Sequence, residues 1–263
     1  MNRYIDREQY FTELCTTSKS YYLDYIGRFK KFDGNSRILE IGCGEGGNLL
    51  PFAETGCRVC GVDISESKIS NAKLFFEKRG ITNANFFCGD FLKTQSDSDF
   101  EAFDIILIHD VIEHIEPGDK SDFFSNVKKF LKSDGIVFWG FPAWQMPFGG
   151  HQQICKTKVC SKIPFVHLLP KNIYGAYLRL FGEEPSRIAE LISIKRSRMT
   201  VESFERLCAK TGYRVLDRTL WLINPHYKVK FHLHPIKLCS LLCRVPHLRN
   251  FLSTSCFYIT ALN

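Results

Sequence analysis

An apolar run over residues 38–41 breaks abruptly into a glycine-rich turn that contains Gly42, Gly44 and Gly47. Glycine has no Cβ atom, so the backbone of such a turn can approach a ligand closely, and the N–H groups that open the next helix carry partial positive charge. The segment therefore predicts a strand, a turn and a helix that together hold a nucleotide-like ligand. The same three glycines also satisfy the dinucleotide-binding spacing, so two cofactor classes remain open at this point.

Further strands are predicted downstream, and polar residues follow their ends. The second strand ends in Asp63, close to the spacing at which a Rossmann-type fold holds ribose hydroxyls. The next two runs, 84–88 and 103–108, are followed by Asp90 and His109. Open parallel sheets bind ligands at the carboxyl ends of their strands, so these side chains are expected to share one edge.

In their order and residue types, these motifs resemble the class I S-adenosylmethionine-dependent methyltransferases. The matching residues are Glu40-x-Gly42-x-Gly44, Asp63, Gly89-Asp90-Phe91, the strand and turn over 103–114, and Leu131-Lys132-Ser133-Asp134-Gly135 before a fifth strand over 136–141. The resemblance implies an α/β, Rossmann-like fold, with a mostly parallel seven-stranded sheet, an antiparallel last strand and helices on both faces. Nicotinamide-dependent oxidoreductases rarely place an acid like Glu40 before the first glycine. An oxidoreductase, or a non-catalytic binding protein on the same fold, remains the alternative.

The resemblance also implies a cofactor, S-adenosyl-L-methionine, with S-adenosyl-L-homocysteine as the product, and a set of residues around it. By residue number the expected cofactor-binding set is Glu40, Gly42, Gly44, Asp63, Ile64, Asp90, Phe91 and His109. Glu40 would order the turn and the cofactor's amino group, Asp63 would hold the ribose hydroxyls, and Asp90 would accept from the adenine amino group. For Ile64 and Phe91, ordinary core packing is an equal alternative.

The methyl group of a sulfonium is already activated, so a base is needed only when the acceptor must lose a proton. The expected catalytic residues are His109, His114 and His151, since histidine titrates near neutrality. No metal is expected. As an alternative, the set Asp110, Glu113, His114 and His151 is similar to the Glu-x-x-Glu-His with a later His of methyltransferases that bind vicinal hydroxyls through a divalent metal. For Glu113, the competing interpretation is a structural role in a turn that opens a helix.

The chain is expected to form one methyltransferase domain, residues 1–263, with two insertions. The expected parts are an N-terminal helical region (1–35), a cofactor-binding half (36–142), a substrate-cap insertion (143–198) and a C-terminal half (199–263) with a basic insertion at 224–253. The cap holds nine Lys or Arg against three acids, and the second insertion holds five against none, in a chain of net charge +7. Excess positive charge where substrate arrives favours an anionic acceptor or membrane surface, although solvated loop lysines are an equal alternative.

Together these features predict methyl transfer to an oxygen of a small or lipid-linked acceptor, with peripheral membrane contact possible and nucleic acid not expected as a partner. The polar first residues do not form a signal peptide, and there is no apolar run long enough to span a bilayer, so a cytoplasmic protein is expected. The eleven cysteines are expected to be reduced thiols. Cys155-x4-Cys160 lacks a paired set at zinc-finger spacing, so a structural zinc site is not expected.

Overall fold

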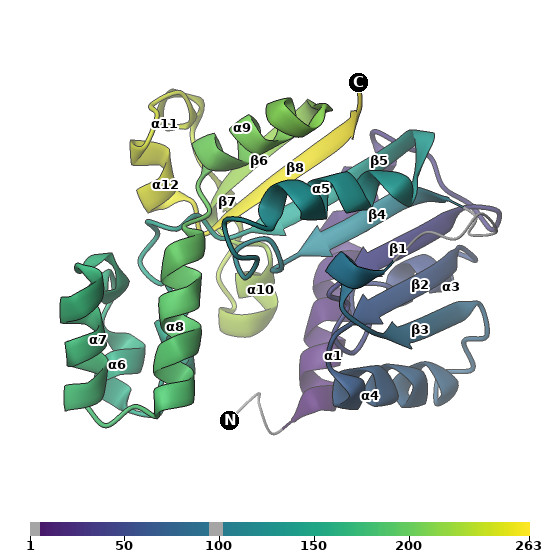
Figure 1. Cartoon of the computed structure of the whole chain (residues 1–263). Helices are drawn as coiled ribbons and strands as arrows, with labels where there is room; N and C mark the ends of the chain where they lie inside the picture. The colour runs from purple at the N-terminus through teal and green to yellow at the C-terminus, as the bar shows by residue number, and fades with distance from the viewer. Residues whose placement is uncertain (1–5, 95–101) are drawn as a thin grey trace.

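The computed structural model describes residues 6–94 and 102–263, which form a twisted sheet with helices on both faces (Figure 1). The strand order is β3-β2-β1-β4-β5-β8-β6-β7. Strands β1 to β5 run parallel, and β8 lies antiparallel between β5 and β6. The bounds are β1 Arg37–Ile41, β2 Arg58–Asp63, β3 Ala84–Cys88, β4 Phe103–His109, β5 Leu131–Phe141, β6 Tyr213–Ile223, β7 Ile236–Lys237 and β8 Ser255–Leu262.

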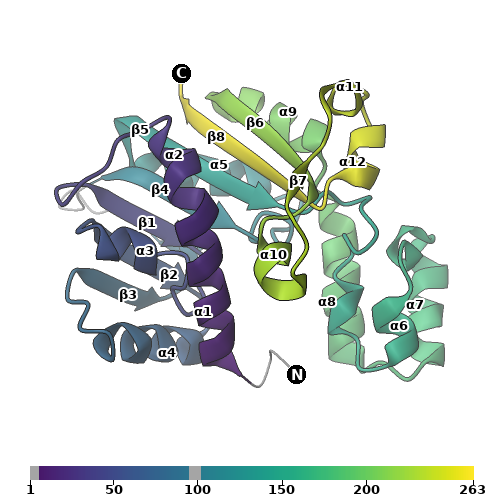
Figure 2. The same ribbon diagram turned by 180° about the vertical axis from the view of Figure 1, so that it is seen from behind.

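The helices fall into two layers and a separate lobe (Figure 2). One face of the sheet carries α1 Arg7–Thr17, α2 Leu23–Gly27, α3 Leu50–Glu54 and α4 Glu66–Glu77, and the other carries α5 Lys120–Lys129 and α9 Val201–Thr211. The lobe comprises α6 Lys158–Lys162, α7 Lys171–Leu180 and α8 Pro185–Ser197. The last insertion contributes α10 His226–Phe231, α11 Ser240–Cys243 and α12 Leu248–Leu252. None of the helices in the described ranges is both long and apolar enough to cross a membrane.

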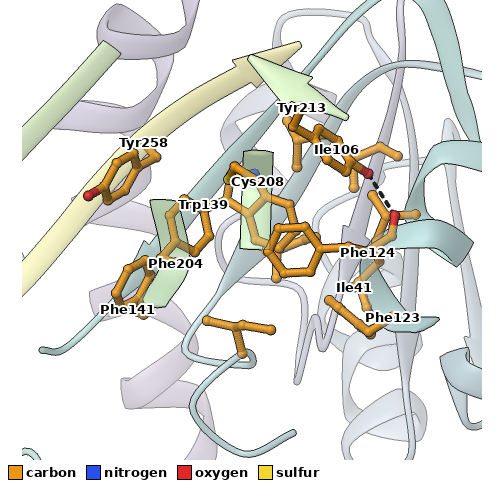
Figure 3. Close-up of a cluster of buried hydrophobic side chains, with 14 of the residues drawn as sticks. Ile41, Ile106, Phe123, Phe124, Trp139, Phe141, Phe204, Cys208, Tyr213 and Tyr258 are labelled. Carbon is orange, nitrogen blue, oxygen red and sulfur yellow. Dashed lines mark hydrogen bonds between the residues drawn. The ribbon is translucent and has the colours of Figure 1, made fainter. Parts of the chain in front are cut away.

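Alternate side chains of the central strands enter two different cores. In β4, Ile106 and Ile108 pack with α5 and α9, whereas Ile105 and Leu107 pack with the helices of the opposite face. This period of two is what an extended strand imposes, and burial of both sets is typical of a parallel sheet covered on both sides. Figure 3 shows the first core, where the rings of Phe124 and Trp139 stack with centroids 4.5 Å apart.

The Rossmann-like fold and its antiparallel last strand are confirmed, with local differences. An eighth strand, β7, arises within the basic insertion and adds two residues beside β6. The helix expected to open at Glu113 begins only at Lys120, so Glu113 lies in a turn instead. Within the expected N-terminal helical region, residues 1–35, helical structure ends at Gly27 and contains a π-helical turn, Ser18–Tyr22. Of that region, residues 1–5 lie outside the described part.

We predict that Phe124→Ala lowers the free energy of unfolding by about 3–5 kcal/mol, because it leaves a cavity against Trp139 in a fully packed core. Chemical denaturation followed by tryptophan fluorescence measures the change. Phe87→Ala is the matched control, since Phe87 is 54% exposed and its truncation empties no core volume. Equal losses in the two variants would contradict the assignment of this core.

Candidate active site

The glycine turn after β1 is braced by the carboxylate that ends β2. Gly42 and Gly44 adopt positive φ angles of 73° and 54°, which favour glycine. Asp63 Oδ2 accepts the Gly44 N–H at 2.9 Å, and Asp63 Oδ1 accepts the Ser65 N–H at the same distance. Asp63 is buried, and backbone N–H groups orient both of its carboxylate oxygens. Each oxygen retains a lone pair, so ribose hydroxyls remain possible partners.

Buried oxygen atoms without partners surround this turn. Asn48 Nδ2 donates to Glu40 Oε1 at 2.7 Å, which leaves Glu40 Oε2 and Asn48 Oδ1 buried with no hydrogen bond among the described residues. Glu45 is also buried; its Oε1 pairs with Arg7 and its Oε2 has no hydrogen bond there. Burial raises the pKa of Glu40 to about 8. Unpartnered buried acceptors are costly, so the arrangement suits a ligand that brings a cationic donor.

The three residues expected around adenine lie in different settings. Ile64 follows β2 and is 75% exposed, so it does not pack in a core and is free to cover a ligand face. Asp90 Oδ1 accepts the Leu92 N–H at 3.1 Å, and the rest of its carboxylate is partly accessible. Phe91 is buried against Phe123 and Phe130. Core packing accounts for Phe91, and its contact with a cofactor stays a prediction.

His109 sits at the end of β4 with both ring nitrogens engaged. Nδ1 lies 3.3 Å from Asp110 Oδ2, and Nε2 lies 2.9 Å from the Tyr22 hydroxyl. Because a carboxylate only accepts, Asp110 places a proton on Nδ1. Gly140 on β5 makes room for the ring, since a Cβ there would lie 2.2 Å from His109 Cδ2. His109 is thus held in one orientation, with Tyr22 between it and the N-terminal helices.

Three of the four residues in the alternative metal set converge, although they come from distant segments. Ligand atoms of Glu113, His114 and His151 lie within 4.8 Å of one another, and the His114 and His151 ring centroids are 4.9 Å apart. Both carboxylate oxygens of Glu113 are buried with no hydrogen-bond partner in the described ranges. Asp110 instead faces His109.

Burial and neighbouring charges set the protonation states in this cluster. Burial, followed by the charge on Asp110, raises the pKa of Glu113 well above its usual range. Burial and the His114 ring lower the pKa of His151 to about 4, and burial also lowers the pKa of His114. Burial opposes the charge of Asp110, but the neighbouring histidines, His109 above all, lower its pKa to about 2. Burial thus favours the neutral forms of Glu113, His114 and His151, whereas contact with His109 favours the ionised form of Asp110.

Sequence reasoning missed several residues of this site. One is Tyr22, which lies in the π-helical turn with its hydroxyl 2.9 Å from His109 Nε2, whereas Tyr25 nearby donates to Asp217. Asn48 also went unnoticed, although an amide shortly after a glycine turn is a usable signal. Nothing in the sequence pointed to Tyr227 on α10. Burial, and next the charge of Asp110, raise the pKa of its hydroxyl.

The geometry is that of a nucleotide-type ligand site at the carboxyl edge of a parallel sheet, and the comparisons specify its kind. Residues 38–135 match the family described as a methyltransferase domain. Residues 38–135 of this chain thus form a methyltransferase domain. Among its relatives, the ubiquinone biosynthesis O-methyltransferase of Nitrobacter winogradskyi is 37% identical over 118 residues, which cover 41% of this chain and 42% of that protein.

A ubiquinone biosynthesis O-methyltransferase from Actinobacillus pleuropneumoniae is 29% identical over 119 residues, or 44% of this chain and 50% of that protein. The methyltransferase domain thus spans half or less of these relatives. Among solved structures, an S-adenosylmethionine-dependent methyltransferase from Clostridium acetobutylicum matches with a TM-score of 0.57 at 12% identity, over 94% of this chain and 92% of that one. The cyclase SpnF matches with a TM-score of 0.54 at 13% identity, over 92% and 80%. These two likenesses show the fold alone.

Proposed function

We propose that this chain is an S-adenosylmethionine-dependent methyltransferase that acts at an oxygen of a small or lipid-linked, anionic acceptor. The observation that carries the proposal is the pair of unpartnered buried oxygens, Glu40 Oε2 and Asn48 Oδ1, beside the glycine turn. A cationic amino group is the donor that such a pair lacks, and a nicotinamide dinucleotide offers none in the corresponding position. This favours a sulfonium amino acid over the nicotinamide alternative.

In this proposal each residue has a separate task. Backbone at Gly42 and Gly44 faces the methionine portion, Glu40 and Asn48 hold its amino group, and Asp63 accepts from the ribose. Ile64, Asp90 and Phe91 form the adenine end. When bound, the cofactor supplies an activated methyl group, and transfer depends chiefly on positioning and exclusion of water.

His109 is the proposed proton acceptor for a hydroxylated substrate. Asp110 holds the proton on Nδ1, so Nε2 is the nitrogen available to receive another. Without substrate, the Tyr22 hydroxyl, 2.9 Å away, donates to Nε2. A substrate hydroxyl would then either replace the Tyr22 hydroxyl as the donor to Nε2 or donate to Tyr22 and pass its proton on through it. His114 and His151 flank the same edge as further candidates. The relatives named O-methyltransferases support an oxygen acceptor rather than nitrogen or carbon.

The cofactor assignment predicts proton release on binding. Without ligand, the Glu40 carboxyl has a pKa of about 8 and is mostly protonated at pH 7. A cationic amino group favours the carboxylate, so binding expels a proton and affinity rises with pH from about 6 to about 7.5, where α-amino groups remain largely charged. Calorimetry with S-adenosylmethionine and S-adenosylhomocysteine, in buffers of different ionisation enthalpy, measures this release.

Glu40→Gln is expected to abolish the proton release and weaken binding by about 10- to 100-fold, as loss of a charge-assisted hydrogen bond predicts. Asp63→Asn removes one of the two oxygens that accept backbone N–H groups, so it should weaken binding through both the ribose contact and the turn. Glu54→Gln, at an exposed position paired with Lys19, is the matched control and should change neither quantity. Tight NAD binding without binding of either sulfur compound would overturn the cofactor assignment. Cofactor binding without turnover of any acceptor would favour the non-catalytic alternative.

A second candidate concerns a metal. We propose that Glu113, His114 and His151 can hold a divalent cation that orients acceptor oxygens. Two neutral imidazoles and a carboxylate are a ligand set that first-row metals accept, and a cation would supply the partner that both Glu113 oxygens lack. The residues present therefore fit the group, with Asp110 outside the set.

Electron paramagnetic resonance of Mn²⁺ titrated with the protein tests this candidate. Binding requires Glu113 to lose its proton, so affinity is expected to rise with pH, and Glu113→Gln should weaken it at least about 10-fold. Glu205→Gln, in an Arg218 pair remote from the cluster, is the control. Unchanged Mn²⁺ affinity in Glu113→Gln would remove the metal from the proposal.

We also propose that residues 143–198 act as a substrate cap whose outer face contacts anionic lipid. Residues 151–182 contain five Lys or Arg and no acid. Apolar side chains are exposed among them, including Ile163, Ile173 and Leu180, of which Leu180 is 80% exposed. Basic residues around exposed apolar side chains are typical of segments that lie on anionic bilayers.

Sedimentation with vesicles tests this contact. Binding is expected for vesicles of phosphatidylglycerol with phosphatidylcholine and not for phosphatidylcholine alone. The double variant Ile173→Asp/Leu180→Asp should lower the bound fraction several-fold, because it places charge at the buried side of the interface. Leu74→Asp, at an exposed apolar position on α4, is the control. Equal binding by the double variant and the control would exclude this face.

A further inference from the structure

The α6–α8 lobe has a small core of its own, separate from the two cores of the sheet. Its buried members are Cys155, Cys160, Val166, Tyr174, Leu178 and Leu191. A helical unit of this size buries little apolar surface, and such units are commonly stabilised by disulfides or bound metal. Two of its six buried core residues are cysteines, a residue type that can bind a metal or form a disulfide.

Three potential ligand atoms converge in this core. The sulfur atoms of Cys155 and Cys160 and a carboxylate oxygen of Glu183 lie within 4.8 Å of one another, and all three residues are buried. Cys155 ends the short 3-10 turn Gln152–Ile154, Cys160 lies in α6, and Glu183 lies in the turn between α7 and α8. The cluster thus joins three segments of the lobe.

Glu183 is held in a fixed orientation by hydrogen bonds. Oε1 accepts the backbone N–H and the hydroxyl of Thr157, both at 2.9 Å. Oε2 accepts the Lys156 N–H at 3.1 Å and the Arg187 guanidinium at 3.4 Å. Ligating carboxylates in metal sites are commonly oriented by such a second layer of donors.

A buried hydroxyl beside the cluster also lacks a partner. Tyr174 is completely buried, and its hydroxyl has no hydrogen bond among the described residues. Tyr174 packs in the same core as Cys155 and Cys160. An unsatisfied hydroxyl in an apolar core indicates that a polar species is missing there.

We propose that Cys155, Cys160 and Glu183 form a structural site for a soft divalent cation, Zn²⁺ by chemical preference, at the centre of the α6–α8 lobe. Thiolates select zinc over magnesium or calcium. A water molecule completes the four-coordinate shell, and the Tyr174 hydroxyl is the polar group beside it. Both thiol protons pass to solvent on binding. Two thiolates, one carboxylate, one divalent cation and the Arg187 guanidinium then balance to zero charge.

Cobalt substitution tests the site in the full-length protein purified under reducing conditions. About one Co²⁺ per chain should bind with a sulfur-to-cobalt charge-transfer band, and Zn²⁺ should displace it. Cys155→Ser and Cys160→Ser should each lose the band and the matching zinc, measured by elemental analysis. The exposed Cys239→Ser is the control and should keep both. Circular dichroism checks that each variant is folded.

The outcomes separate this site from the one near Glu113. Glu113→Gln must keep the charge-transfer band, because that cluster contains no sulfur. Absence of the band in the reduced wild-type protein would overturn the proposal. So would an intact mass showing that Cys155 and Cys160 have lost two hydrogen atoms to a disulfide under the same conditions. Retention of the band in both serine variants would contradict the assigned ligands.

Discussion

The structure depends on a sheet whose central strands are apolar on both faces. Ile105 and Leu107 enter one core while Ile106 and Ile108 enter the other, so helices must cover both sides. Polar side chains therefore concentrate near the strand ends, as Glu40, Asp63 and His109 do at one edge. The insertions that extend from this edge lie around them.

The candidate site contains buried carboxyl groups whose burial is energetically unfavourable in the free protein. Glu40 and Glu113 are buried carboxyls with unpartnered oxygens, and burial raises the pKa of both. Each such atom costs folding free energy of about 1–3 kcal/mol. A ligand that brings cationic or hydrogen-bonding groups removes this cost, so the same defects that weaken the free protein strengthen binding. Asp110 behaves in the opposite way, since contact with His109 lowers the pKa of its carboxyl.

Two buried lysines attach the lobe to the rest of the chain. Lys120, at the start of α5, donates to the Ser197 carbonyl and hydroxyl at 2.9 and 2.8 Å. Lys195, on α8, donates to the His167 carbonyl at 2.7 Å and lies over the Trp144 ring. Burial lowers the pKa of Lys120 to about 8. The Lys120 contacts thus hold the end of α8 against the start of α5.

The sequence by itself determined the strand pattern, the glycine turn and the residues at strand ends, because hydrophobic period and turn chemistry are local. Asp63, at the end of the second strand, could be read in this way. Only the tertiary structure decided that Tyr22 meets His109 and that Glu183 joins two cysteines. The expectation that the turn at Glu113 opens a helix was wrong for a related reason. In sequence, a buried carboxyl after a strand looks the same as an acidic residue in the first turn of a helix. Contacts between distant segments depend on how helices pack, and no local pattern encodes that packing.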